Sequence, residues 1–166
     1  MEDMTFNNAQ AERLIGMPYG TLKTVIRQGF CRHQGGVGKW TRRQVTAIAV
    51  MRAARRQGAT LVAAVAAYDI LVNMKAEILQ GHAAAGRKYL VLLGEMAILR
   101  PVSRERAYDD DLREQAIRNH LPLVIVDLEQ VDAAMSQAIQ EMKDNPGENF
   151  PGRKRLAPVG RPMIAN

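Results

Sequence analysis

The side chains best suited to chemistry in this 166-residue chain are basic and hydroxyl groups near its N-terminus. Residues 21–28 form a predicted helix in which Lys23, Thr24 and Arg27 fall on one side, at spacings of three and four. Apolar residues fill its other side. Long cations and a hydroxyl can reach phosphates and the edges of bases. This division is typical of a helix that packs one side in a core and offers the other to a nucleic acid.

A second predicted helix and a turn precede this one. Residues 9–15 are a short amphipathic run, and residues 16–18 form a Gly-Met-Pro turn. Gly29 ends the second helix, and residues 31–40 then form a basic hairpin that contains three glycines. Two short helices across a tight turn predict a helix-turn-helix, and the hairpin is placed to be its wing. We expect Trp40 to be a packing anchor for that wing.

These segments resemble the winged-helix domain of the MerR superfamily over residues 5–70. The stretches that carry the resemblance are Ala9-Gln10-Ala11-Glu12-Arg13-Leu14-Ile15-Gly16, Thr21-Leu22-Lys23, Arg27-Gln28-Gly29-Phe30, Gly38-Lys39-Trp40-Thr41, and residues 52–58 leading into Thr60-Leu61. The resemblance implies a helix-turn-helix, a wing, two further helices and usually a dimer on pseudo-palindromic DNA. The chain departs from the family at Pro18, where a Ser-type cap is usual, and at Gly20, where a polar contact residue is common.

The positive charge is concentrated in the same part of the chain. Residues 1–60 hold ten basic and three acidic residues, residues 61–144 hold nine and thirteen, and residues 145–166 hold four and one. This is the distribution that a polyanionic partner requires. The predicted DNA-contacting residues are Tyr19, Thr21, Lys23, Thr24, Arg27, Arg32, His33, Gln34, Lys39, Arg42 and Arg43.

Two longer helices are predicted after the wing. Thr41 and Gln44 form a capping box, and Gly58 has the position of a C-terminal glycine. Thr60 can cap the next helix, which runs to about residue 80. Its apolar stripe includes Leu61, Val65, Tyr68 and Val72. The stripe fits either core packing within the monomer or a two-helix dimer seam, and we favour the seam because the segment is long and rich in alanine.

The C-terminal half has a mixed pattern. Strands are predicted at residues 89–93 and 97–102, although residues 97–99 are also compatible with a helix. The pattern then predicts a helix at 109–120, a strand at 121–126 and a helix at 128–142. Asp127 and Gln130 form a cap pattern before the last helix. The predicted class is mainly α with a small α+β part. It comprises a winged helix-turn-helix at 1–58, a linking helix at 59–86, a ββαβα dimerisation or sensing module at 87–144 and a disordered basic tail at 145–166.

Other chemistries find little support. Cys31 is the only cysteine, His33, His82 and His120 are scattered, and no nucleophile–base pair is visible, so we expect no metal, cofactor or catalysis. The acidic N-terminus lacks a secretory signal. The most apolar stretch, residues 59–72, is too short to span a bilayer. We therefore expect a cytoplasmic protein without membrane contact.

The predicted function is that of a sequence-specific transcriptional regulator that binds a pseudo-palindromic operator as a homodimer. The alternative is a phage-type DNA-architectural or packaging factor, of the excisionase or small-terminase kind. An enzyme with its active site in residues 87–144 ranks far below both. A small-molecule or protein effector remains open.

Overall fold

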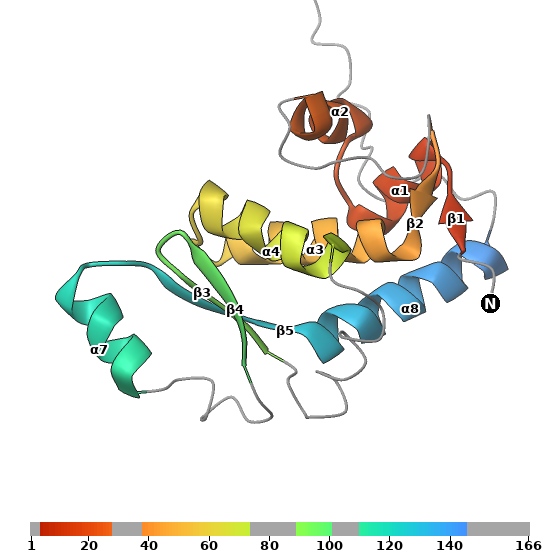
Figure 1. Ribbon diagram of the computed structural model, residues 1–166. Coiled ribbons are helices and arrows are strands. Elements are labelled where there is room, and N and C mark those ends of the chain that lie inside the picture. The colour runs from red at the N-terminus through yellow and green to blue at the C-terminus, as the bar shows by residue number, and fades with distance from the viewer. Residues whose placement is uncertain (1–3, 28–37, 74–88, 101–109, 146–166) are drawn as a thin grey trace, which may run out of the picture.

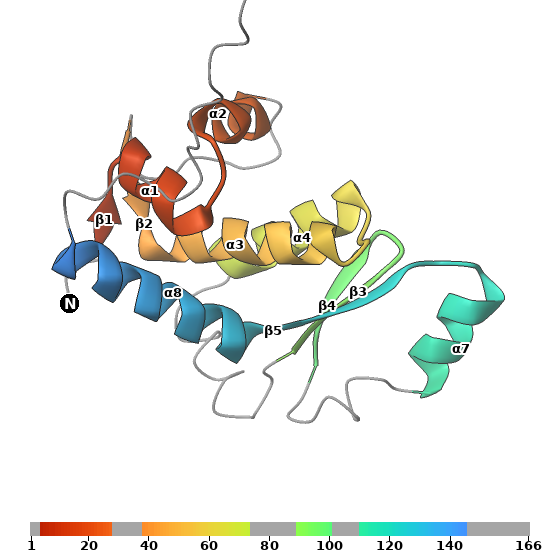
Figure 2. The same ribbon diagram turned by 180° about the vertical axis from the view of Figure 1, so that it is seen from behind.

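The computed structural model describes residues 4–27, 38–73, 89–100 and 110–145. Residues 4–27 and 38–73 hold two short strands and four helices, arranged as Figures 1 and 2 show. They are β1 (Thr5–Phe6), α1 (Asn8–Ile15), α2 (Tyr19–Arg27), β2 (Trp40–Thr41), α3 (Arg42–Arg56) and α4 (Leu61–Asn73). The second half holds β3 (Tyr89–Leu93), β4 (Met96–Arg100), α7 (Asp110–Arg118), β5 (Leu123–Asp127) and α8 (Leu128–Asp144). The fold is therefore mainly helical with a small antiparallel part, as predicted.

Local hydrogen bonds explain where the helices begin and end. The Thr41 hydroxyl accepts from the Gln44 backbone N–H and the Gln44 side chain accepts from the Thr41 N–H, which confirms the predicted capping box. Asp127 Oδ1 caps α8 by accepting from the N–H groups of Glu129 and Gln130. Gly58, with a φ of 96°, stands one residue beyond the C-cap of α3 and ends that helix.

The C-terminal strands form one antiparallel sheet in the order β4-β3-β5. Gly94 and Glu95 make the two-residue turn between β3 and β4, since Leu93 pairs with Met96. The sequence of strands and helices agrees with the predicted ββαβα pattern. However, β4 begins at Met96, one residue earlier than predicted, and β5 begins at Leu123, two residues later. The N–H of Leu121 donates to the Ala116 carbonyl in the turn after α7, so Leu121 is not part of the strand.

The two faces of this sheet are covered differently. Leu90, Leu92 and Val126 belong to the main core, which includes residues of α1, α3, α4 and α8. Val91 and Leu93 face the other way and pack with residues of α7. The predicted boundaries at residues 58 and 86 therefore do not separate hydrophobic cores: the main one contains side chains from both halves of the chain.

Most of the predicted apolar stripe of α4 is buried in the core of the monomer. Tyr68 is 1% exposed and Val72 is 5% exposed, and Val65 packs half-buried against the same core. Core packing within the monomer thus accounts for the inner part of the stripe, and Tyr68 and Val72 have no surface to offer a dimer seam. Leu61 is 41% exposed. The remainder of the predicted linking helix, residues 74–86, lies outside the described residues.

The end of the predicted wing pairs with a strand that the sequence pattern did not reveal. β2 forms a two-stranded antiparallel sheet with β1, in which Trp40 pairs with Phe6. Trp40 is 1% exposed and donates its indole N–H to Asn8 Oδ1 at 2.9 Å, so it is the packing anchor that we expected. Residues 31–37 of the predicted wing and the predicted tail from residue 146 lie outside the described residues. Within the described ranges, no helix combines the length and hydrophobicity needed to cross a membrane.

Candidate nucleic-acid interface

A side chain of α3 contacts the turn between α1 and α2. Gly16 ends α1 with a φ of 64°, and the Arg52 guanidinium of α3 donates a hydrogen bond to the Ile15 carbonyl beside it. The positive φ favours glycine at position 16, and a Cβ atom there would lie 2.6 Å from Arg52 Nη1 and displace that guanidinium. Burial, and then the charge of Arg56, lower the pKa of Arg52.

The inner side of α2 is anchored by one fully buried residue. Leu22 is 0% exposed, and Val25 packs half-buried against the core. The Pro18 carbonyl accepts hydrogen bonds from the backbone N–H groups of Thr21 and Leu22, which starts the helix without a side-chain cap.

The outer side of α2 is polar and exposed. With 100° of rotation per residue, Lys23, Thr24 and Arg27 lie within an arc of about 100°, and Thr21 lies next to it. All four are exposed. The Thr24 hydroxyl donates to the Gly20 carbonyl at 2.9 Å, which ties its side chain to the helix. The helix therefore offers two long cations and two hydroxyl-bearing side chains to a partner.

Gly20 lies in the middle of this arc. A Cβ atom there would meet no described atom within 4 Å, and its φ is not positive, so neither packing nor backbone geometry of the described fold requires a glycine. Because Gly20 has no side chain, a partner can approach the helix backbone more closely at the centre of the exposed arc than at its edges. Tyr19 is the first residue of α2.

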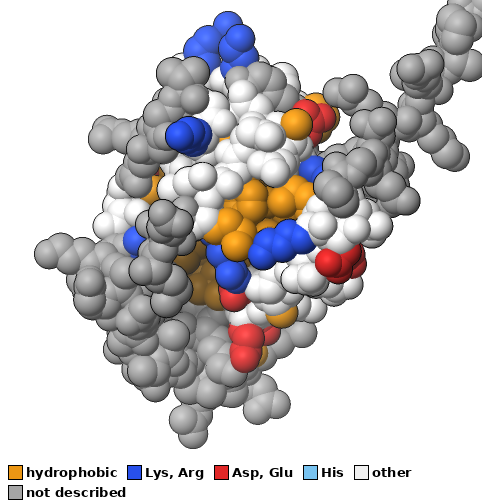
Figure 3. Space-filling view, turned by 90° about the vertical axis from the view of Figure 1, so that its right-hand side faces the viewer, with side chains coloured by type: hydrophobic (Ala, Val, Ile, Leu, Met, Phe, Trp, Pro, Cys, Tyr) orange, Lys and Arg blue, Asp and Glu red, His pale blue; other side chains and the backbone are white. Residues whose placement is uncertain are grey.

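The cations of α2, and Lys39 just before β2, differ from Arg42 and Arg43 of α3 in their partners. Lys23, Arg27 and Lys39 are exposed and have no hydrogen-bond or ionic partner within the described ranges. In Figure 3 the uppermost described side chains are basic, at the height that α2 has in Figure 1. These charges remain available to a polyanion.

Two predicted contact residues on α3 are instead bound inside the chain. Arg42 Nη2 lies 3.0 Å from Asp132 Oδ1 and 2.8 Å from the Ser136 hydroxyl, both on α8. Arg43 Nε donates to the Leu71 carbonyl at 2.6 Å. These two side chains connect α3 to α8 and to α4. Arg32, His33 and Gln34 lie outside the described residues.

Sequence reasoning missed two further arginines that position this region. Arg52 holds the turn, and Arg13 Nη1 of α1 donates to the Asn145 carbonyl at the end of α8, at 3.1 Å. The approach of Arg13 to Asn145 could not be read from a local pattern, because 132 residues separate them. α8 and its C-cap are therefore bonded to both α1 and α3.

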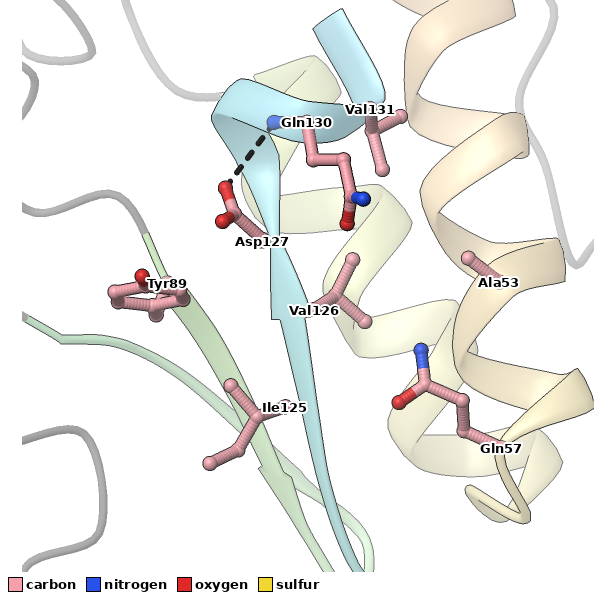
Figure 4. Close-up of a pocket in the computed structure, with 8 residues that line it drawn as sticks. All are labelled: Ala53, Gln57, Tyr89, Ile125, Val126, Asp127, Gln130 and Val131. Carbon is pink, nitrogen blue, oxygen red and sulfur yellow. Dashed lines mark hydrogen bonds between the residues drawn. The ribbon is translucent and has the colours of Figure 1, made fainter. Parts of the chain in front are cut away.

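A cavity of about 230 Å³ lies between the end of α3 and the junction of β5 with α8 (Figure 4). Gln57 and Gln130 extend toward the space beside Val126, and Asp127 uses one carboxylate oxygen to cap α8. The volume falls below the roughly 300–1,000 Å³ of sites for drug-sized ligands. We therefore assign it no ligand. Within the described ranges no group of three or more His, Cys, Asp or Glu side chains could hold a metal ion.

Comparison with models of known protein families finds no match to this chain, and comparison with curated protein sequences finds none either. The candidate interface therefore rests on its own geometry.

Proposed function

We propose that this chain is a DNA-binding transcriptional regulator that inserts α2 into the major groove and acts as a dimer on a pseudo-palindromic operator. The observation that carries the proposal is the division of α2. Leu22 fixes the helix to the core, while Lys23, Thr24 and Arg27 stay exposed on one arc. A helix presented in this way fits the width of the major groove.

The side chains of the arc suit both parts of DNA recognition. An arginine such as Arg27 can make two hydrogen bonds to a guanine edge, and Lys23 can contact a phosphate or a base. Lys39, beside β2, adds a cation that can contact the backbone. The excess of basic residues in residues 1–60 favours the approach of a polyanion, whereas the acidic excess in residues 61–144 disfavours it there.

The first experiment selects binding sites for the full chain from random duplex DNA and measures the affinity for the selected site. Arg27→Ala should weaken specific binding by about 1–3 kcal/mol if Arg27 reads a base. Arg118→Ala is the matched control, because Arg118 is also exposed but pairs with Glu114 on α7. Equal affinities of the two variants for the selected site would contradict the placement of α2 in the major groove.

Footprinting then separates regulation from packaging. A regulator protects one short site upstream of a gene, plausibly its own. An architectural or packaging factor, the alternative that uses the same helix, protects a series of repeated sites.

A further inference from the structure

Exposed apolar side chains gather at one end of the molecule. Among the described residues, six large hydrophobic side chains are at least 36% exposed, and five of them belong to the start of α4, the start of β4 and the end of α7 with the segment after it. These five are Leu61, Val62, Met96, Ile117 and Leu121, and we call them the hairpin-end patch. The sixth, Met4, precedes β1. Figures 1 and 2 both place the start of α4 beside the β3–β4 turn.

Hydrogen bonds hold the parts of the patch together. The Thr60 hydroxyl, next to Leu61, donates to the Gly94 carbonyl at 2.7 Å. The Gly94 N–H donates to the Pro122 carbonyl at 3.1 Å, next to Leu121. Gly94 thus joins the start of α4, which packs on one face of the sheet, to the segment that enters β5 from α7, which packs on the other, so the patch extends around the end of the hairpin.

The sheet register adds a shallow groove to this surface. Met96 and Leu123 both pair with Leu93, so they lie on the same face of the sheet. Leu123 lines an open groove of about 410 Å³ together with Ile117 and Leu121 of the patch. Arg113 and His120 stand at its polar rim. An apolar surface with a charged rim is typical of a protein–protein contact.

The charges around the patch fit a second copy of the same chain. Glu95 lies at the tip of the β3–β4 turn, and Arg113 lies at the rim of the groove; both are exposed and have no ionic partner within the described ranges. In a twofold interface every contact occurs twice with the roles of the two copies exchanged, so Glu95 of each copy can pair with Arg113 of the other. One patch then supplies both signs of charge.

We propose that the hairpin-end patch is the face through which two copies of this chain pair. The proposal rests on the proposed function for one point only, namely that two recognition helices are needed to read two half-sites. In Figures 1 and 2, α2 lies away from this end, so pairing there leaves its polar arc free. The patch also replaces the predicted seam residues Tyr68 and Val72, which are buried in the monomer.

Sedimentation of the full chain without DNA tests the pairing. The wild type should show twice the 18.4 kDa chain mass at micromolar concentration. Ile117→Glu should raise the dimer dissociation constant at least tenfold, since a charge would enter the apolar contact. Ile117 is 68% exposed, so the substitution leaves the monomer core intact; Met4→Glu, at an exposed apolar residue outside the patch, is the matched control and should stay dimeric. A monomeric wild type, or a dimer that survives Ile117→Glu, would overturn the proposal.

Charge reversal tests the arrangement of the two copies. Glu95→Arg and Arg113→Glu should each weaken the dimer several-fold, and the double variant should recover most of the loss. Failure of the double variant to recover would overturn the twofold arrangement. Because both measurements are made without DNA, their failure is distinguishable from failure of DNA binding by α2.

Discussion

The cations of α2 and those of α3 carry the same charge but have different surroundings. Lys23 and Arg27 project from a helix that buries Leu22, and they meet no ionic partner within the described ranges. Arg43 and Arg52 lie on a helix in the middle of the core, and each donates to a backbone carbonyl of a neighbouring segment. Arginines that hold the fold together, such as Arg43 and Arg52, must therefore be left out of the count before an excess of basic residues is taken to indicate a nucleic-acid partner.

Leu22→Ala should have the largest effect, because it removes the anchor that separates the two sides of α2. A fully buried leucine replaced by alanine costs about 2–5 kcal/mol, and a loss of this size is expected in the free energy of unfolding measured with urea. Thr21→Ala, at the exposed neighbouring position, is the control and should change stability by less than about 0.5 kcal/mol. Equal losses for both variants would mean that α2 is not held by Leu22.

Gly16→Ala should come next, because the turn depends on α3. The positive φ alone costs an alanine about 1–2 kcal/mol, and the Arg52 guanidinium must also move. Thermal unfolding should therefore occur at a lower temperature. If Gly16→Ala leaves both stability and DNA affinity unchanged, the contact between Arg52 and the turn does not position α2.

Arg42→Ala tests whether an α3 cation supports the fold or the DNA contact. Its ion pair with Asp132 is partly exposed, at 43% and 58% for the two side chains, so we expect a loss of stability no larger than about 1 kcal/mol. Specific DNA affinity should fall less than it does in Arg27→Ala. A larger fall in DNA affinity in Arg42→Ala than in Arg27→Ala would reverse the comparison between the two helices.

Gly20→Ala should have the smallest effect on the fold and should act in the stabilising direction. Alanine fits the helix without meeting a described atom within 4 Å, and such substitutions stabilise by about 0.4–1 kcal/mol. If a DNA backbone approaches α2 closely at Gly20, the DNA affinity of Gly20→Ala should fall while its unfolding temperature rises. A gain in stability with unchanged affinity would show that the partner does not approach α2 at Gly20.

Much of the local structure could be predicted from the sequence, because it depends on residues a few positions apart. The capping box of Thr41 with Gln44, the cap at Asp127 and the C-terminal glycine Gly58 all agree with the structure. The polar arc of α2 is local as well, since a helical period places Lys23 and Arg27 on the same side. The DNA-contacting role assigned to these residues stays a prediction.

Only the tertiary structure decided which surfaces remain exposed. Tyr68 and Val72 continue a periodic apolar stripe, yet packing against the core buries them, whereas Leu61 in the same stripe stays exposed. Arg42 reads as one more cation of a basic segment, but α8 brings Asp132 to it from 90 residues away. Periodicity shows which residues share one side of a helix; which neighbour covers that side depends on contacts between distant segments, and these form only when the whole core packs.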